Sequence, residues 1–193
     1  MSGEPSLSVV VFAYNEAENV QPVLLELRDW LAGHEPDAEV IFVDDGSTDA
    51  TYDRAREALQ GARHRMVRHA ENRGIGAALK SGVRAAAAPW VTFMPADGQI
   101  DPSALGDLVQ AAAGTGAGVV FSVYDRRDDG FDRKILSWGV RALIRTIHGV
   151  NMHSDGPYLF QRSLFVPEEM PSDSFLRLPA SPLWVRTIAW KPP

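Results

Sequence analysis

Short β-branched, apolar runs alternate with amphipathic helical segments along this chain, and this alternation restricts its fold more than any other feature. The apolar runs, which predict buried strands, cover residues 8–12, 39–43, 65–68, 90–94 and 118–124. The segments between them predict helices over residues 20–33, 50–60 and 101–113, and a further helix that follows a turn at residues 72–76 and reaches about residue 87. Strands that alternate with helices of this length need right-handed crossovers and form a mostly parallel sheet covered on both faces. We therefore expect an α/β protein with three α/β/α layers around a mostly parallel central sheet.

The composition is that of an ordinary globular protein, with 45% apolar and 23% charged residues among 193. A formal net charge of −6 argues against a nucleic-acid partner, because such proteins usually carry a basic patch. Cysteine is absent, which excludes disulfides and thiolate metal sites and fits a cytoplasmic location. The first residues lack the basic and apolar regions of a signal peptide, and no apolar run approaches the roughly 18 residues of a membrane span.

The pattern of strands and helices weakens toward the C-terminus. Six of the 13 prolines fall in residues 167–193, where they disfavour regular helix. The sequence thus predicts one domain over residues 1–166 and an irregular, loosely attached segment over residues 167–193.

The apolar run at residues 90–94 ends at Pro95 and is followed by Asp97 and Gln99. Open α/β sheets bind ligands beyond the carboxyl ends of their strands. Carboxylate and amide oxygens suit Mg²⁺ or Mn²⁺, which often take only one or two protein ligands and complete their shell with phosphates and water. A metal–diphosphate site is one interpretation, and a simple Asp-Gly turn is the other.

Two more strand ends carry acidic groups, Tyr14-Asn-Glu16 after the first run and Asp44-Asp45 after the second. In a parallel sheet these ends share one edge, so the carboxylates converge and repel one another unless a cation or hydrogen-bond donors compensate. A metal with a nucleoside diphosphate provides such compensation. Alternatively, each segment is only a turn or a helix cap, with Ser47 or Thr48 capping the next helix.

Several cations lie where they would reach phosphate oxygens. Lys80 follows the turn at residues 72–76 by one helical turn, although a solvated surface lysine is the more common outcome. Arg126 and Arg127 would clamp an anion with bidentate geometry, or would belong to a solvated charge run. The turn itself lacks a full G-x-G-x-x-G pattern, so a nicotinamide cofactor is not indicated.

Together these segments resemble a family-2 glycosyltransferase of the GT-A fold. The motifs are Val-Val-Phe-Ala-Tyr-Asn-Glu, Val43-Asp-Asp-Gly-Ser-Thr-Asp, Asn72-Arg-Gly-Ile-Gly-Ala-Ala-Leu-Lys-Ser-Gly and Ala96-Asp-Gly-Gln, in the family's order between about residues 6 and 165. The nearest likeness is to the polyprenyl-phosphate branch, the dolichyl-phosphate mannose or glucose synthases. The resemblance implies transfer of a sugar, with inversion, from a nucleoside-diphosphate sugar such as a GDP- or UDP-sugar to an acceptor, most simply a polyprenyl phosphate.

The resemblance also implies roles for individual residues. Tyr14, Glu16 and Asp44 or Asp45 match positions that contact the nucleoside; Asp97 and Gln99 match the Mg²⁺ or Mn²⁺ pair, with Ala96 beside the diphosphate. A polyprenyl phosphate is largely dianionic at neutral pH and needs no strong general base. A hydroxyl acceptor would need one, for which Asp155, in a segment resembling the family's acceptor region, is the candidate.

The chain departs from the family pattern in three places. Pro95 stands where many members have the first acid of Asp-x-Asp, and Phe12 stands in place of a proline. Beyond residues 174–176 the usual acidic residue is missing. These departures keep open a second hypothesis, a catalytically weak relative that binds a nucleotide sugar or a partner subunit. A nucleotidyltransferase is disfavoured, because the glycine-rich N-terminal loop with Arg and Lys is lacking.

The segment at residues 135–147 predicts an amphipathic helix with Arg141 and Arg145 beside its apolar face. Such a helix would allow peripheral contact with the inner face of a membrane, and a helix docked on the protein core shows the same pattern.

Overall fold

The computed structural model describes residues 4–124, 157–165 and 185–190. Its strands and helices alternate as the sequence predicts, with boundaries that differ by a few residues at most. The strands are β1 (Leu7–Ala13), β2 (Glu39–Asp44), β3 (His64–Arg68), β4 (Trp90–Pro95), β5 (Val119–Tyr124), β6 (Tyr158–Gln161) and β7 (Val185–Trp190). The helices are α1 (Val20–His34), α2 (Thr51–Ala58), α3 (Ile75–Ala85), α4 (Ser103–Thr115) and the short 3₁₀ turn η1 (Arg162–Leu164).

The described strands form one seven-stranded sheet in the order β3-β2-β1-β4-β6-β5-β7. Strands β3, β2, β1 and β4 pair in parallel, as expected from the helical crossovers between them. Strand β6 enters antiparallel between β4 and β5, and β7 pairs in parallel with β5. The sheet is thus mostly parallel, and strand β1 is covered on both faces.

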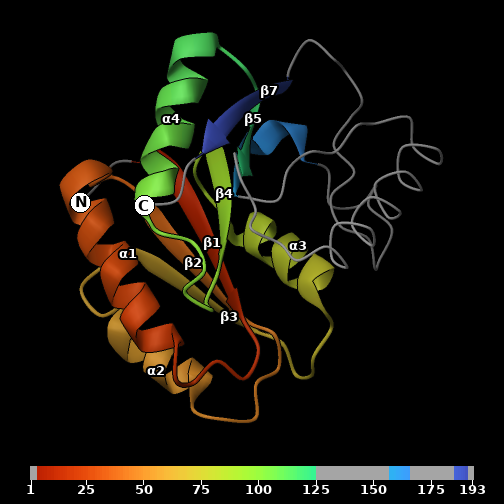
Figure 1. Cartoon of the computed structure of the whole chain (residues 1–193). Coiled ribbons are helices and arrows are strands. Elements are labelled where there is room, and N and C mark those ends of the chain that lie inside the picture. The colour runs from red at the N-terminus through yellow and green to blue at the C-terminus, as the bar shows by residue number, and fades with distance from the viewer. Residues whose placement is uncertain (1–3, 125–156, 166–184, 191–193) are drawn as a thin grey trace, which may run out of the picture.

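Figure 1 shows α1, α2 and α4 on one side of the sheet and α3 on the other. Alternate residues of each strand therefore enter different cores. In β1, Val9 and Val11 pack with the three-helix side, while Val10 packs with α3. The three α/β/α layers predicted from the sequence are confirmed.

The prediction of irregular structure after residue 167 was wrong for one stretch. Residues 185–190 form β7, which pairs with β5 over its whole length. The run Val-Arg-Thr-Ile-Ala-Trp lies between Pro182 and Pro192, contains no proline and is rich in β-branched residues, so it can join a sheet.

The predicted helix at residues 135–147 lies outside the described residues. Among those described, no helix combines the length and apolar character that crossing a membrane requires.

Candidate functional site

The register of the parallel strands aligns the three polar strand ends that the sequence predicts to converge. Ala13 at the end of β1 pairs with Asp44 of β2, and Phe12 pairs with Pro95 of β4. The alignment continues past the strands, because the Asp45 N–H donates to the Ala13 carbonyl at 2.9 Å. The loops after β1, β2 and β4 consequently leave the sheet side by side.

A cavity of about 360 Å³ opens among these loops and the start of α3. Its walls bring together five of the residues that the sequence predicts for the site: Tyr14, Glu16, Asp45, Ala96 and Asp97. The remaining lining residues come from the ends of β1 and β4 and from the turn into α3: Phe12, Ala13, Asn72, Gly74, Ile75, Ala78 and Pro95. Tyr14 and Ile75, each 45% exposed, are large apolar side chains open to solvent here. An apolar rim with a few carboxylates below it suits a ligand with both ring and polar parts.

The loops after β1 and β2 are joined by side-chain hydrogen bonds. The Asn15 N–H donates to Ser47 Oγ at 3.0 Å, and the Thr48 N–H donates to Asn15 Oδ1 at 2.9 Å. Asn15 adopts φ +53°, a left-handed conformation that asparagine tolerates. The prediction that Ser47 or Thr48 caps α2 was therefore wrong: its N-cap is Ala50, and both side chains lie between loops, not at the helix end.

Asp49 holds the start of α2 and the backbone of the loop after β1. Its Oδ1 accepts from the Thr51 N–H at 2.9 Å, its Oδ2 accepts from the Ala17 N–H at 3.2 Å, and Thr51 Oγ1 in turn accepts from the Glu16 N–H at 2.8 Å. Desolvation raises the pKa of Asp49, but the hydrogen bonds from Thr51 and Ala17 outweigh it and leave that pKa below its ordinary value of 3.8. The carboxylate thus stays charged and fixes Glu16 on the cavity wall.

Asp44 and Asp45 follow one another but have different surroundings. Asp44 is fully buried, its Oδ1 accepts from the Ser47 N–H at 3.1 Å, and Arg68 Nε lies 2.9 Å from its Oδ2. That ion pair is close but not aligned as a hydrogen bond, so Oδ2 has no hydrogen-bond donor among the described residues. The Arg68 guanidinium also lies 4.8 Å from the centre of the Tyr52 ring. Asp44 does not line the cavity, whereas Asp45 does.

Asp45 connects β2 to the turn that begins α3. Its Oδ1 accepts from His69 Nδ1–H at 2.6 Å and from the Arg73 N–H at 3.1 Å, and its Oδ2 accepts from the Gly74 N–H at 2.8 Å. Sequence reasoning missed His69. The available signal was its place directly after the third strand, where polar side chains reach the same sheet edge.

The two interpretations of the Asp97 segment are compatible in the structure. Asp97 Oδ1 accepts from the Gln99 N–H at 3.0 Å, and Gly98 between them has φ +76°, so the segment is a turn. Asp97 nevertheless lines the cavity, while Gln99 is exposed and is not on its wall. Among the described residues, no group of three or more His, Asp or Glu side chains is arranged to hold a metal.

Of the predicted phosphate-binding cations, the structure describes Lys80, which does not line the cavity. Lys80 lies on α3 and is only 8% exposed, so the expectation of a solvated lysine was wrong; α3 buries this position against the sheet. Arg126, Arg127 and Asp155 lie outside the described residues.

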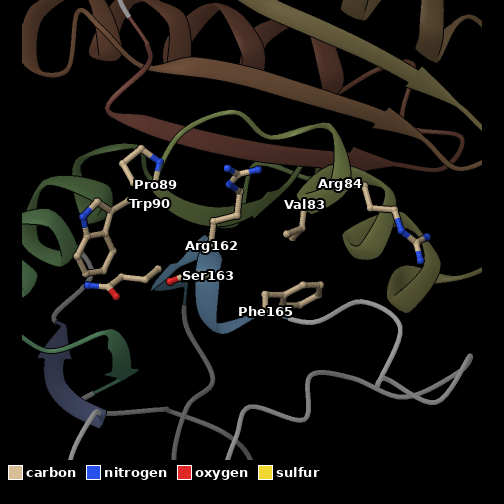
Figure 2. A pocket seen from close by; sticks show the side chains of 8 residues that line it. Val83, Arg84, Pro89, Trp90, Arg162, Ser163 and Phe165 are labelled. Atoms are coloured by element: carbon tan, nitrogen blue, oxygen red, sulfur yellow. The ribbon is translucent and has the colours of Figure 1, made fainter.

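A larger cavity of about 590 Å³ lies at the opposite edge of the sheet, beside the start of β4 and the end of α3. Figure 2 shows its lining, which includes Trp90, Arg162 and Phe165. Arg162 donates to the Ala86 carbonyl at 3.2 Å, which joins the turn after β6 to the end of α3. No predicted site residue within the described ranges lines this cavity.

This three-layer α/β protein has its carboxylate-lined cavity at the carboxyl ends of its parallel strands, the edge at which open α/β sheets bind their ligands. The chain is a member of glycosyl transferase family 2, whose profile matches residues 8–167. This confirms the GT-A fold and the resemblance found in the sequence motifs.

Several curated relatives are named for sugar transfer to polyprenyl phosphates. The chain is 34% identical over 153 residues to the dodecaprenyl-phosphate galacturonate synthase of Rhizobium johnstonii, which covers 78% of this chain and 45% of that protein. It is 31% identical over 157 residues to the dolichol-phosphate mannosyltransferase of Mycosarcoma maydis, covering 76% and 53%. The chain thus spans about half the length of these relatives.

Among solved structures, the glucosyl-3-phosphoglycerate synthase of Mycobacterium tuberculosis is similar in fold. Its complex with Mn²⁺, UDP-glucose and phosphoglyceric acid matches with a TM-score of 0.64 and 26% identity, covering 84% of this chain and 58% of that one. The complex of the same enzyme with Mg²⁺ and UDP matches with a TM-score of 0.62 and 25% identity, covering 84% and 58%.

Proposed function

We propose that the chain binds a nucleoside-diphosphate sugar in the cavity at the carboxyl ends of β1, β2 and β4 and transfers the sugar, with inversion, to a polyprenyl phosphate. The observation that carries this proposal is that Tyr14, Glu16, Asp45, Ala96 and Asp97 line one cavity, although they come from three separate loops. The curated relatives named for polyprenyl-phosphate sugar transfer support the acceptor class. The UDP-glucose complex of a structural relative supports the donor class.

The nucleoside would lie between Tyr14 and the turn at Gly74 and Ile75. Tyr14 offers an exposed ring for stacking, and Asp45 offers an acceptor for a base N–H or a ribose hydroxyl. Glu16 is held by Asn19, whose Nδ2–H donates to its Oε2 at 2.8 Å. An aromatic ring and a carboxylate acceptor suit uracil and guanine alike, so both UDP- and GDP-sugars are candidate donors.

The donor set at the end of β4 fits Mg²⁺ or Mn²⁺ that takes most of its ligands from the diphosphate. Asp97 is half-buried on the cavity wall. Its Oδ1 accepts from the Gln99 N–H within the turn, and no described residue donates a hydrogen bond to its Oδ2. One or two protein carboxylates are the usual protein share of a Mg²⁺–phosphate site. Asp97 would hold the ion, with Gln99 adjacent. When bound, the ion stabilises the negative charge that develops on the leaving diphosphate.

The remaining chemistry needs little from the protein beyond positioning. A phosphate oxygen of the acceptor attacks the anomeric carbon of the sugar as the bond from that carbon to the diphosphate breaks, which inverts the configuration. The attacking oxygen carries no proton in the dianion, so no general base is required. With a hydroxyl acceptor a base is needed, and Asp155 is the proposed residue. Peripheral contact with a membrane surface would bring the polyprenyl phosphate to the cavity.

A second candidate is nucleotide-sugar binding without efficient transfer. Pro95 occupies the position where many members carry a further acid, which leaves Asp97 as the carboxylate that β4 delivers to the cavity. One carboxylate binds a divalent ion less tightly than two, so the leaving group would be less well stabilised.

A thermal-shift panel of UDP- and GDP-sugars with and without Mn²⁺ tests the proposal. A ligand that binds the folded state raises the midpoint of unfolding by mass action, so we expect a shift with one nucleotide class that grows when Mn²⁺ is added. The same donor is then incubated with a polyprenyl phosphate, and formation of the glycosylated lipid is measured. Binding without any transfer would favour the second candidate, and no binding of any donor would contradict both.

A further inference from the structure

His69 joins the wall of the site cavity to helix α3. Its ring is nearly buried, with the side chain 6% exposed. Nδ1 lies 2.6 Å from Asp45 Oδ1 on one side, and Nε2 lies 2.8 Å from Ser81 Oγ on the other. The His69 main chain is also held, because its N–H donates to the Asp44 carbonyl at 2.8 Å. The imidazole therefore bridges the end of β2 and the middle of α3.

The short contact to Asp45 decides where the Nδ1 proton lies. A carboxylate only accepts hydrogen bonds, so a nitrogen 2.6 Å from it must carry a proton. In the neutral ring Nε2 then accepts from the Ser81 hydroxyl, and in the charged ring it donates to that oxygen. Both states keep the bond to Asp45, and the charge on the acceptor makes that bond stronger than a neutral one.

Asp45 in turn determines where α3 begins. A carboxylate has about four acceptor positions, and His69, the Arg73 N–H and the Gly74 N–H use three of them. Gly74, with φ +83°, is the N-cap of α3 and lines the cavity together with Ile75. His69 makes the shortest of the three contacts, so its loss would let the Asp45 carboxylate rotate. The carboxylate oxygen would then no longer be oriented to accept a hydrogen bond from the nucleoside, and the turn at Arg73 and Gly74 would no longer be held.

We propose that His69 is a positioning residue of the nucleotide site: it orients the Asp45 carboxylate, and through it the turn at Arg73 and Gly74, toward the bound nucleoside. The inference rests on the proposed function, since it assigns a role within the same cavity. His69 itself is not on the cavity wall and does not touch the ligand.

The order carboxylate, imidazole, hydroxyl matches that of a hydrolytic triad. Ser81 lies inside α3 and is not among the residues that line the site cavity. Because Ser81 lies outside that cavity, the arrangement acts in positioning and not in nucleophilic attack.

Two substitutions of His69 separate its contacts. In His69→Asn the amide nitrogen takes the place of Nδ1 and keeps a donor for Asp45, while the link to Ser81 is lost. In His69→Gln the amide reaches the place of Nε2, so the link to Ser81 is kept and the donor to Asp45 is lost. Ser81→Ala removes the same link as His69→Asn. His34→Asn, at the exposed end of α1, is the matched control.

Dissociation constants are measured by calorimetry with UDP or GDP plus Mg²⁺, using whichever binds the wild-type chain, well below the melting temperature of each variant. We expect His69→Gln to weaken nucleotide binding about tenfold or more, since a hydrogen bond to a charged group is lost. His69→Asn and Ser81→Ala should both stay within about threefold of the wild type, and His34→Asn should not change it. Rescue by Asn but not by Gln is the pattern that a purely structural role would not produce.

A double-mutant cycle identifies the route of the effect. If His69 acts through Asp45, the Gln substitution should weaken binding no further in an Asp45→Ala background. Equal affinities for the wild type and His69→Gln, or equal losses for the Gln and Asn variants, would overturn the inference while leaving the proposed function intact. If the wild-type chain binds neither nucleotide, both fail.

Should His69→Gln not fold, the wild-type protein still provides a test. Nitrogen-15 NMR of the histidine rings reports which nitrogen carries the proton, and we expect Nδ1 of His69 to be protonated in every state that is populated. A neutral His69 protonated only at Nε2 would exclude the bond to Asp45 and overturn the inference.

Discussion

Gly46 lies so close to Glu71 that a Cβ atom added to it would be 2.3 Å from the Glu71 carbonyl carbon and 2.5 Å from the Asn72 nitrogen. The turn after β2 thus packs directly on the turn that precedes α3. This contact and the hydrogen bonds of Asp45 to Arg73 and Gly74 act on the same loop. The loop forms one wall of the site cavity, so backbone packing at Gly46 determines part of the shape of the site.

Gly46→Ala should therefore lower both stability and nucleotide affinity. Gly46 has φ +79°, which costs a residue with a side chain about 1–2 kcal/mol, and the contact with backbone atoms adds to this because neither turn can yield easily. Gly61→Ala is the control, because its φ is +82° but nothing lies within 4 Å of the added Cβ. Urea unfolding should show a larger loss for Gly46→Ala, and only Gly46→Ala should weaken nucleotide binding. Equal losses for the two variants would contradict the packing argument.

Gly82→Ala should strongly destabilise the fold without altering the site loops directly. The added Cβ would lie 2.2 Å from Val10 Cγ1, at the point where α3 packs on β1. Overpacking of this kind typically costs about 1–3 kcal/mol. Gly114→Ala in α4 has no atom within 4 Å of the new Cβ and should raise the free energy of unfolding by about 0.5–1 kcal/mol, as expected for alanine in a helix. Thermal unfolding of the two variants should therefore shift in opposite directions.

Glu39→Ala should destabilise the protein by roughly 2–5 kcal/mol, because it leaves the Ser8 hydroxyl and the Ala87 N–H without their acceptor, and each unsatisfied buried donor costs about 1–3 kcal/mol. Glu39 is 2% exposed; its Oε1 accepts from the Ser8 hydroxyl at 2.7 Å and the Ala87 N–H at 2.6 Å, and Arg65 Nε lies 3.2 Å from its Oε2. Glu39→Gln keeps an oxygen acceptor for Ser8 and Ala87 and should lose less. Glu39 begins β2, at the end of the strand away from the site cavity. Calorimetry of both folded variants should therefore show unchanged nucleotide affinity. A parallel loss of affinity would show that the two edges are coupled.

Asp97→Asn should separate the turn from the proposed ion site. An asparagine oxygen can still accept from the Gln99 N–H, so the turn and the fold should persist, while the negative charge that attracts a divalent ion is lost. We expect the gain in nucleotide affinity on adding Mn²⁺ to fall at least about tenfold, with affinity in EDTA little changed. Asp107→Asn on the exposed face of α4 is the matched control. An unchanged Mn²⁺ effect in Asp97→Asn would argue against an ion at this position.

Asp101 should contribute to stability only above acidic pH. The side-chain hydrogen bond with Ser103, together with the Ser103 N–H at 2.8 Å, holds the pKa of Asp101 below its ordinary value of 3.8. A carboxyl whose pKa is lower in the folded state stabilises the protein above the unfolded value, and this contribution is lost as the pH falls through the folded value. Acid unfolding of Asp101→Asn should therefore be less steep below pH 3.8 than that of the wild type.

Local sequence patterns were enough to predict the layers of the fold and the edge of the sheet at which the site lies. Apolar periodicity is a local property, so it located β1, β2, β4 and helices such as α1 and α4 within a few residues. The sequence also placed Tyr14, Asp45 and Asp97 after strands that share one edge, and they do line one cavity.

Which neighbouring residues face that cavity, and what holds them there, depends on tertiary packing. Asp44 and Asp45 are equivalent in a motif, but the alternation of side chains along β2 sends the first to Arg68 and the second to the cavity. The bonds of Asp45 to His69 and Gly74 and the contact of Gly46 with Glu71 join residues more than twenty positions apart. Such pairs depend on strand register and on how α3 docks on the sheet. Local sequence patterns do not contain this information.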